Sequence, residues 1–517
     1  NRSLARRKET MTEQLIFGPP GCGKTHTLME IIRDELNAGT PPDRIGFVSF
    51  SRKAVNEARE RAGAAFNLTE KDTPYFRTLH SLGFKWLGMK TTQMINAYDL
   101  AKIGTDMGLF FDNRDVFDED GLMMQSAREG NKYMTIIHRA AMRRVSLDKE
   151  FNLTGDHRLH FPILVKLSKL YNSYKEETGK HDFTDMIKLM VEQGTAPVLD
   201  LLIVDEAQDL TPLQWEQVKL LRNNAKRVYY AGDDDQAIFK YTGVDIRCML
   251  NVCDDLKILD QSYRVPRAVH HLANRISSMI GTRKVKNWEP TNHDGSIRHY
   301  ININQIDMDE GSWTVMARTT KNLRALGDNL KAMGILYKIN DSLSFNEKLL
   351  RSINLWKELQ AGEFISVEEA ELLYSHLPKR GNDAMVKYGM AKTLKEVDSE
   401  KPLTYNALVE DHGLLASKEL IAEKLLRISE EDLRYLNAIR RRGKISTDPS
   451  IKLSTIHRMK GGEDDNIVLL DDMGYLPYKN YVEGNPDDEH RVFYTAVTRT
   501  RQNLHIVQTG SNHRYPL

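Results

Sequence analysis

The segment Gly18-Pro-Pro-Gly-Cys-Gly-Lys-Thr25 constrains the fold of this chain more than any other feature. A short apolar run, Gln14 to Phe17, precedes it, and a helical pattern follows from about Thr25, so the G-x4-G-K-T spacing lies between a strand and a helix. Glycines let backbone N–H groups wrap around phosphate oxygens, while the helix N-terminus and a lysine add positive charge. A glycine-rich turn could match the spacing by chance, but this context predicts a phosphate-binding loop in an α/β domain.

Short apolar or β-branched runs recur along the chain, and helical patterns separate many of them. This alternation predicts parallel sheets covered by helices on both faces, with ligands at the carboxyl ends of the strands. The further runs are Arg44 to Phe50, Leu199 to Val204, Arg227 to Ala231, Thr314 to Ala317, Asn466 to Leu470 and Leu504 to Val507. Two blocks, from about Gly83 to Leu167 and from about Asn346 to Lys444, show few such runs and carry helical spacing, so we interpret them as helical insertions.

Composition narrows the possible partners and the cellular setting. The chain has 517 residues, too many for one compact core, with 73 Lys and Arg against 72 Asp and Glu, a net charge of +1. A globally basic coat is therefore excluded, and any site for a polyanion has to come from local patches. The chain has three cysteines with no second C-x4-C pair, and it has no apolar stretch long enough to span a membrane. These features predict a cytoplasmic protein without a membrane partner. Residues 1–10 are polar and basic and precede Met11, so we interpret them as a leader or tag remnant.

A second acidic site accompanies the loop. The apolar run Leu201-Leu-Ile-Val ends in Asp205 and Glu206. By itself such a run is usually a strand entering a solvated loop, but paired with a phosphate loop it indicates nucleotide hydrolysis. Asp205 and the hydroxyl of Thr25 would then hold Mg²⁺, and Glu206 would be the general base that orients water. Cys22 lies within the loop and receives no chemical role.

Five further motifs follow in a fixed order. They are Asp205-Glu-Ala-Gln-Asp209, Gly232-Asp-Asp-Asp-Gln236, Gln261-Ser-Tyr-Arg264, Thr455-Ile-His-Arg-Met-Lys-Gly461 and Val497-Thr-Arg499. In order and spacing they resemble the UvrD/Rep/PcrA-like DNA helicases of superfamily 1A. The resemblance implies two RecA-like parallel-sheet domains of the P-loop NTPase type, 1A and 2A, each with a mainly helical insertion, 1B and 2B. The expected boundaries are 11–82 and 168–260 for 1A, 83–167 for 1B, 261–345 and 445–517 for 2A, and 346–444 for 2B.

The resemblance also implies roles for individual residues. Gln208 and Gln236 would sense the γ-phosphate, Tyr263 would stack on adenine, and Glu463 would contact the ribose. Arg264 and Arg499 would act as arginine fingers, because a planar guanidinium suits developing charge on phosphate oxygens. The expected catalytic residues are Lys24, Asp205, Glu206, Gln236, Arg264 and Arg499. The expected nucleotide-binding residues are Gly18, Pro19, Pro20, Gly21, Cys22, Gly23, Lys24, Thr25, His26, Gln208, Tyr263, Arg264, Glu463 and Arg499.

A motor on single strands also needs phosphate contacts and flat groups on which bases stack. The residues expected to bind nucleic acid are Phe50, Arg52, Thr78, His80, Tyr241 and His457. Tyr241 stands where the family has tryptophan, and Thr242 where it has arginine. Core packing is the alternative for Phe50 and Tyr241, and a structural histidine is the alternative for His457.

These expectations describe an ATP- and Mg²⁺-dependent translocase on single-stranded DNA and a 3′-to-5′ DNA helicase. Its expected partners are single strands, single-strand/duplex junctions and replication or repair proteins. It would act as a monomer on DNA in a bacterial or phage-derived cytoplasm, associated with the nucleoid. The alternative is a DNA-stimulated P-loop ATPase that serves as a clamp or switch without processive unwinding. The glutamine motif that the family carries upstream of the phosphate loop is not found here, which bears on nucleotide selectivity. The second insertion is short for the family, which bears on unwinding.

Overall fold

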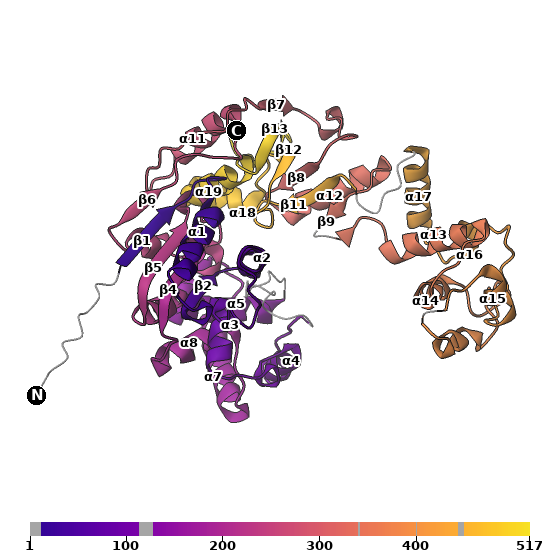
Figure 1. Cartoon of the computed structure of the whole chain (residues 1–517), viewed down its shortest axis with the longest axis horizontal. Coiled ribbons are helices and arrows are strands. Elements are labelled where there is room, and N and C mark those ends of the chain that lie inside the picture. Colours follow the sequence, from indigo (N-terminus) through magenta and orange to yellow (C-terminus); the bar gives the residue numbers. More distant parts are fainter. Residues whose placement is uncertain (1–11, 113–127, 340–341, 400, 443–448) are drawn as a thin grey trace, which may run out of the picture. The chain divides into compact units, whose positions relative to one another are not determined.

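The computed structural model describes residues 12–112, 128–339, 342–399, 401–442 and 449–517 (Figure 1). The expected leader, residues 1–10, lies outside this part. The chain forms two compact units. The first comprises Asn1–Ile297, Lys460–Glu463 and Leu476–Leu504, and the second comprises Arg298–Met459, Asp464–Tyr475 and His505–Leu517.

A six-stranded sheet organises the first unit, in the order β3-β2-β4-β5-β1-β6. Every neighbouring pair in it is parallel. Its strands are β1 (Thr12–Phe17), β2 (Ile45–Ser49), β3 (Phe76–Thr78), β4 (Leu199–Asp205), β5 (Ala225–Gly232) and β6 (Leu256–Ile258). Phe17 lies opposite Gly232, and Ser49 lies opposite Asp205. The carboxyl ends of these strands therefore share one edge of the sheet, and the loops that follow them meet there.

Helices pack their apolar faces on this sheet. Leu28 and Ile32 of α1 (Lys24–Asn37) and Val55 and Ala58 of α2 (Arg52–Phe66) belong to one buried core with residues of β1, β2, β4 and β5, because their spacing of three or four residues places them on one helix face. The other helices of this part are α3 (Leu79–Trp86), α4 (Ala97–Thr105), α5 (Glu129–Arg143), α6 (Leu147–Thr154), α7 (Phe161–Thr178), α8 (Phe183–Gln193), α9 (Pro212–Arg222), α10 (Ile246–Leu250), α11 (Arg267–Ser277), α18 (Tyr475–Glu483) and α19 (Asp487–Val497).

A separate helical core lies within the segment expected to form the first insertion. Its buried residues run from Leu100 to Tyr171, and Tyr133, Met134 and Ile137 contribute to it from one face of α5. Helices α4 and α7, which both contribute to this core, lie close together in Figure 1. A core of its own stabilises this block without a sheet.

A second, seven-stranded sheet has the order β10-β9-β11-β8-β12-β13-β7. Its strands are β7 (Ser296–Tyr300), β8 (Trp313–Ala317), β9 (Lys338–Ile339), β10 (Ser342–Leu343), β11 (Ile451–Thr455), β12 (Asp464–Leu470) and β13 (Thr500–Val507). Strand β11 pairs in parallel with β8 and β9, β12 pairs in parallel with β8, and β10 pairs antiparallel with β9. Leu323 and Leu330 of α12 (Thr320–Ala332) cover the apolar residues of β8 and β11.

The second helical block also has its own core, which runs from Leu336 to Ile439. Trp356 is fully buried at its centre, and its indole Nε1 donates to the backbone oxygen of Leu420 at 2.6 Å. The helices α13, α14, α15 and α16 gather together in Figure 1. Their bounds, with that of the last helix of the block, are α13 (Glu347–Ala361), α14 (Val367–His376), α15 (Tyr405–Glu410), α16 (Ala422–Leu425) and α17 (Glu430–Arg442).

The expected α/β class with two largely parallel sheets is confirmed. Each of the seven runs that the sequence predicted as strands lies within or overlaps a strand of the structure, namely β1, β2, β4, β5, β8, β12 and β13. Within the described residues, no helix combines the length and the apolar character needed to cross a bilayer.

Candidate functional site

The predicted phosphate loop connects β1 to α1. Gly21 and Gly23 have φ angles of 75° and 73°, a left-handed conformation that favours glycine. Gly23 is the N-cap of α1, and helix α1 begins at Lys24. The backbone N–H of Gly18 donates to the oxygen of Gly232 at 3.0 Å, which fixes the loop against the end of β5. The first turn of α1 thus presents its N–H groups and Lys24 beside the loop, an arrangement that suits phosphate.

Lys24 faces the two acids that end β4. Its Nζ lies 2.7 Å from Glu206 Oε1 and 3.7 Å from Asp205 Oδ1. Burial would raise the pKa of Glu206, but the charges of Lys24 and Lys460 outweigh it and lower that pKa to about 2. Burial raises the pKa of Asp205 to about 6, and the neighbouring Glu206 adds to the effect. Glu206 is therefore a carboxylate at neutral pH, as a general base has to be.

Glu206 occupies an unusual backbone position, with φ at 51°. A non-glycine residue at positive φ is uncommon, and the surrounding contacts have to hold it there. The second carboxylate oxygen of Glu206 accepts a hydrogen bond from the amide of Gln208, whose own oxygen accepts from the N–H of Asp233 at 3.1 Å. The loop after β4 is thereby joined to the loop after β5.

Gln236 and Arg499 continue this chain of hydrogen bonds. Gln236 Nε2 donates to Asp233 Oδ2 at 2.6 Å, and Arg499 Nη2 donates to Gln236 Oε1 at 2.7 Å. Arg499 is 2% exposed, and its Nε donates to the backbone oxygen of Thr495 at 3.0 Å. Burial, with Arg264 nearby, lowers the pKa of Arg499 to about 9, which leaves the guanidinium charged at neutral pH.

The segment Gln261–Arg264 lies directly on the phosphate loop. The N–H of Tyr263 donates to the oxygen of Gly21 at 2.9 Å, and Ser262 Oγ donates to the oxygen of Pro20 at 2.7 Å. A Cβ on Gly21 would lie 2.4 Å from the Cβ of Arg264, so only glycine allows this approach. Arg264 pairs with Glu463, and the ring of Tyr263 is 77% exposed beside Gly23. The sequence had singled out Tyr263, Arg264 and Glu463, and the structure brings them together at the loop.

Lys460 lies in the motif Thr455–Gly461, but no role was predicted for this lysine from the sequence. Its ammonium pairs with Asp209, donates to the backbone oxygen of Gln236 at 2.8 Å, and lies 5.0 Å from the centre of the Phe239 ring. Burial raises the pKa of Asp209 to about 6, although the charge of Lys460 opposes the shift. Lys460 therefore touches the loops after β4 and β5 and an aromatic ring at once. Only the folded chain brings these partners together.

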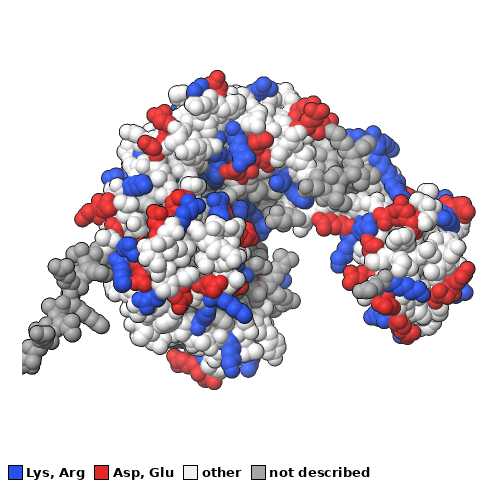
Figure 2. All heavy atoms as spheres, viewed as in Figure 1, with Lys and Arg blue, Asp and Glu red and all other residues white. Residues whose placement is uncertain are grey.

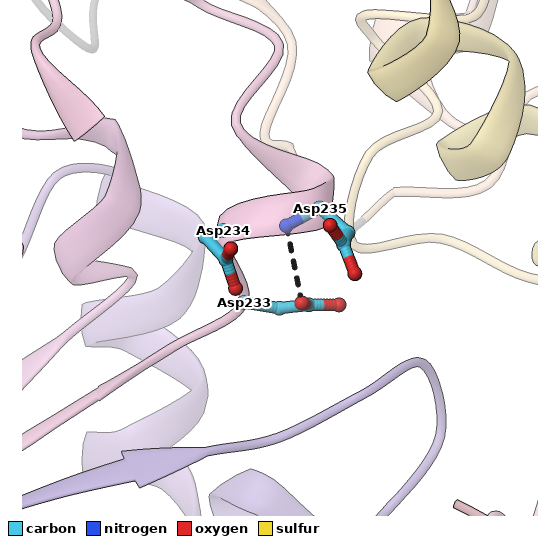
Figure 3. Close-up of side chains that lie close together, drawn as sticks. All are labelled: Asp233, Asp234 and Asp235. Atoms are coloured by element: carbon cyan, nitrogen blue, oxygen red, sulfur yellow. Dashed lines mark hydrogen bonds between the residues drawn. The ribbon is translucent and has the colours of Figure 1, made fainter. Parts of the chain in front are cut away.

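Asp233, Asp234 and Asp235 are three buried carboxylates whose oxygens lie within 4.8 Å of one another (Figure 3). Their spacing would suit a metal ion, but the ammonium of Lys286 lies among them. Its Nζ is 2.9 Å from Asp233 Oδ1, 2.9 Å from Asp235 Oδ2, and in contact with Asp234. The three carboxylates therefore bind the ammonium of Lys286, a side chain of the same protein. The sequence gave no signal for Lys286, which lies about fifty residues from the three acids.

The residues expected to hold Mg²⁺ are Thr25, at the first turn of α1, and Asp205. The carboxylate of Asp205 is buried at the end of β4, 3.7 Å from the ammonium of Lys24. Hard oxygen donors of this kind are the ligands that Mg²⁺ prefers. The two residues therefore fit the ion.

An aromatic cluster lies beside this site, formed by Phe50, Phe239 and Tyr241. The rings of Phe50 and Phe239 stack with centroids 5.5 Å apart, and Tyr241 meets Phe239 edge-on at 6.2 Å. Phe50 is 6% exposed and packs within the cluster, whereas Tyr241 is 39% exposed and presents its ring to solvent. Arg52 is exposed on the first turn of α2. Tyr241 and Arg52 are thus partly exposed, whereas Phe50 packs against Phe239.

Three other residues expected to touch nucleic acid have different surroundings. Thr78 is buried and caps α3, where its hydroxyl accepts from the N–H of Ser81 at 3.2 Å. His80 is 6% exposed, its ring meets Phe183 edge-on, and burial lowers its pKa to about 4. His80 is thus a neutral, enclosed imidazole packed against an aromatic ring, and its contact with a strand stays a prediction. His457 is half-buried in the turn after β11, in the second unit.

A basic residue near Tyr241 comes from α5, in the first helical block. Arg143 Nη2 donates to the backbone oxygen of Lys240 at 3.3 Å, and a Cβ on Gly243 would lie 3.1 Å from Arg143 Cγ. On the face shown in Figure 2, positive and negative residues are intermixed, in keeping with the net charge of +1. The charge distribution on this face therefore shows no single basic patch.

The fold and the site define a P-loop nucleotide hydrolase built on parallel sheets. Two family models match the chain: the UvrD/REP helicase N-terminal domain over residues 3–257 and the UvrD-like helicase C-terminal domain over residues 405–511. Together they cover more than two thirds of the sequence. The chain belongs to the UvrD/REP family of ATP-dependent DNA helicases, superfamily 1A, whose members use ATP and bind DNA.

Individual relatives are distant. The ATP-dependent DNA helicase UvrD2 of Mycobacterium tuberculosis is 22% identical over 95% of this chain and 75% of its own length. The ATP-dependent DNA helicase PcrA of Staphylococcus aureus is 23% identical over 72% of this chain and 52% of its own length. Among solved structures, an arterivirus nonstructural protein 10 helicase aligns with 97% of this chain and 61% of its own at 10% identity, but its TM-score of 0.34 is too low to support any argument.

Proposed function

We propose that this protein is an ATP-driven translocase on single-stranded DNA that unwinds duplexes in the 3′-to-5′ direction. The observation that carries the proposal is the contact between Arg499 and Gln236, continued through Asp233, Gln208 and Glu206 to Lys24. Residues far apart in sequence meet around one phosphate loop, so ATP bound there would be sensed by several loops together.

In the proposed reaction, Lys24 and the N-terminus of α1 bind the β- and γ-phosphates. Phosphate arriving at Lys24 competes with Glu206 for the ammonium, which frees the carboxylate to accept a proton from the attacking water. Arg264 and Arg499 stabilise the charge that develops on the transferred group. Tyr263 stacks on the base, and Glu463 contacts the ribose.

Mg²⁺ is the proposed metal ion, held by Thr25 and Asp205. When bound, it would neutralise phosphate charge and orient the leaving group. The protein's own contribution at this point is the placement of both ligands beside Lys24, at the carboxyl edge of the parallel sheet.

Lys460 provides the proposed link between hydrolysis and the strand. It bonds to Asp209 and Gln236 and lies over the ring of Phe239, which in turn contacts Phe50 and Tyr241. A shift of Gln236 on ATP binding or phosphate release would therefore move the aromatic cluster. Bases stacked on Tyr241 would be displaced with it, which is the step that a translocase repeats.

The direction of movement and the partners come from the resemblance. We propose action as a monomer on single strands and on single-strand/duplex junctions, together with replication or repair proteins, in a bacterial or phage setting. His457 and Thr78 remain proposed contacts of the strand.

ATP hydrolysis measured against single-stranded DNA, duplex DNA and RNA at fixed salt tests the proposal. A motor on single strands gives turnover that rises with single-stranded DNA and saturates with its length. Duplexes with a 3′ or a 5′ tail then report direction, and opening only the 5′-tailed one would contradict the proposed polarity. Strand-stimulated turnover without opening of either substrate would favour a clamp or switch.

A further inference from the structure

We propose that Lys286 is a positioning residue for ATP hydrolysis: it fixes the carboxylate of Asp233 so that the amide of Gln236 presents its oxygen to Arg499. The inference rests on the proposed roles of Gln236 and Arg499 in hydrolysis. It adds a residue that lies outside the sequence motifs quoted above.

The surroundings of Lys286 are unusual for a lysine. Its side chain is fully buried, and its ammonium lies among Asp233, Asp234 and Asp235. It also lies 5.4 Å from the centre of the Phe17 ring, the last residue of β1 before the phosphate loop. A fully buried lysine is rare unless it is paired, and this one joins the acidic loop to the end of the strand that carries the phosphate loop.

Two arginines also bind the acidic cluster. Arg283 donates to both carboxylate oxygens of Asp235, at 2.8 and 2.5 Å, and Arg491 Nε donates to the backbone oxygen of Asp234 at 2.9 Å. With Lys286, three cations therefore face the three aspartates. Arg283 and Arg491 hold one side of the cluster, and of these three cations it is Lys286 that pairs with the carboxylate of Asp233.

The hydrogen bonds of Asp233 show what this contact does. Its Oδ1 lies 2.9 Å from Lys286 Nζ and accepts from the N–H of Asp235 at 3.2 Å, and its Oδ2 accepts from Gln236 Nε2 at 2.6 Å. Lys286 thus orients one oxygen, and the other oxygen then receives the NH₂ group of Gln236. Because that group faces a carboxylate, the amide oxygen has to point the other way, where Arg499 donates to it.

Without the ammonium, Oδ1 of Asp233 keeps the N–H of Asp235 but loses its charged partner, so the carboxylate is held less firmly. The NH₂ group of Gln236 still faces this carboxylate, but the carboxylate can shift, and the amide oxygen then shifts relative to the guanidinium of Arg499. The contact between Gln236 and Arg499 is thereby misplaced. The contacts of Lys286 are with the acidic loop and with Phe17, and the phosphate-binding group itself is Lys24. Binding of the nucleotide should therefore be less affected than its hydrolysis.

The test uses the full chain with Lys286→Met, a neutral side chain of similar length. Lys284→Met is the matched control, because Lys284 lies two residues away with an exposed side chain. Measurements are the dissociation constant of a fluorescent, slowly hydrolysed ATP analogue, the kcat and KM for ATP with and without single-stranded DNA, and the melting temperature. We expect Lys286→Met to bind the analogue within about twofold of the unchanged protein, and its kcat to fall by about 100-fold, as misplacement of a catalytic group does.

A second variant separates positioning from charge balance. Lys286→Met/Asp234→Asn removes one positive and one negative charge, so the net charge of the cluster is unchanged, and the amide oxygen introduced at position 234 can still accept from the N–H of Lys284. The proposal expects the melting temperature of this variant to recover while its kcat stays low. A kcat restored together with the melting temperature, or failure of both variants to fold, would make Lys286 a structural residue and overturn the proposal. If the unchanged protein hydrolyses ATP without stimulation by DNA, the proposed function fails instead, and the same comparison is made on basal turnover.

Discussion

Replacing Glu206 by glutamine is the sharpest test of the proposed chemistry, because the change removes a proton acceptor and almost no volume. Transfer of the proton to a positioned base contributes about 10²- to 10⁴-fold to catalysis. We therefore expect kcat to fall by about 10³-fold, equivalent to about 4 kcal/mol in activation free energy. Binding of ATP should persist, because Lys24 would be released from its closest counter-ion.

The structure also predicts a side effect on stability. Both oxygens of Glu206 accept hydrogen bonds, one from Lys24 and one from the amide of Gln208. The new NH₂ group has to face one of these donors, and an unsatisfied buried group costs about 1–3 kcal/mol. Gln208 cannot simply turn over, because its own oxygen accepts from the N–H of Asp233.

A compensating variant separates the two effects. In Glu206→Gln/Gln208→Glu the amide and the carboxylate exchange places, so that the carboxylate at position 208 accepts both from the new amide at position 206 and from the N–H of Asp233. The melting temperature should then recover in part, because position 208 loses the hydrogen bond that Gln208 Nε2 donates to Asp209 at 3.2 Å. Single-turnover hydrolysis should remain about 10³-fold slow, since no carboxylate stands at position 206. Hydrolysis within about tenfold of the unchanged protein in either variant would refute Glu206 as the base.

Three further predictions concern the strand and the buried charges. Tyr241→Ala should weaken binding of a fluorescent oligothymidine by about 1–3 kcal/mol, roughly 5- to 150-fold at fixed salt. Tyr241→Phe should bind almost as well as the unchanged protein. Equal affinities of the unchanged protein and both variants would exclude stacking. Lys460→Met/Asp209→Asn, which removes a buried pair together, should bind ATP normally but lose stimulation of hydrolysis by single-stranded DNA; retained stimulation would show that the link lies elsewhere. His80→Asn should reduce the acid sensitivity of folding. The pKa of His80 is about 4 in the folded protein against an ordinary 6.5, so between these values the unfolded chain binds the extra proton, and stability falls as the pH drops. By pH 5 the free energy of unfolding falls by about 2 kcal/mol from this cause. The melting temperatures of the unchanged protein and of His80→Asn are measured between pH 7.5 and pH 5, and an equal decrease in both would contradict the argument.

The sequence predicted best those features that depend on neighbours along the chain. The phosphate loop is one of them, because its glycines, its lysine and the strand and helix around it are contiguous. The buried strands that carry Phe17 and Asp205 are others, since continuous apolar runs of that length have few alternatives in an α/β protein. Short edge strands such as β3 and β6 escaped prediction, because three residues leave no readable pattern.

Burial was harder to predict. The sequence predicted strand contacts for His80 and Phe50, and in the fold His80 packs against Phe183 and Phe50 stacks on Phe239. Each partner lies more than one hundred residues away in the sequence, so no local pattern could indicate it. Tyr241 had the same local appearance but remains accessible.

The charged contacts around the phosphate loop depend on the tertiary structure alone. Motif order named Gln236, Arg264 and Arg499, but the bond from Arg264 to Glu463 and that from Arg499 to Gln236 follow from packing. Lys286 is the clearest case: in the sequence it is one lysine in a polar stretch, and in the fold it is a buried cation among three carboxylates. The physical reason is that a motif depends on chain geometry over a few residues, whereas the energy of a buried charge depends on every group that the whole fold places around it.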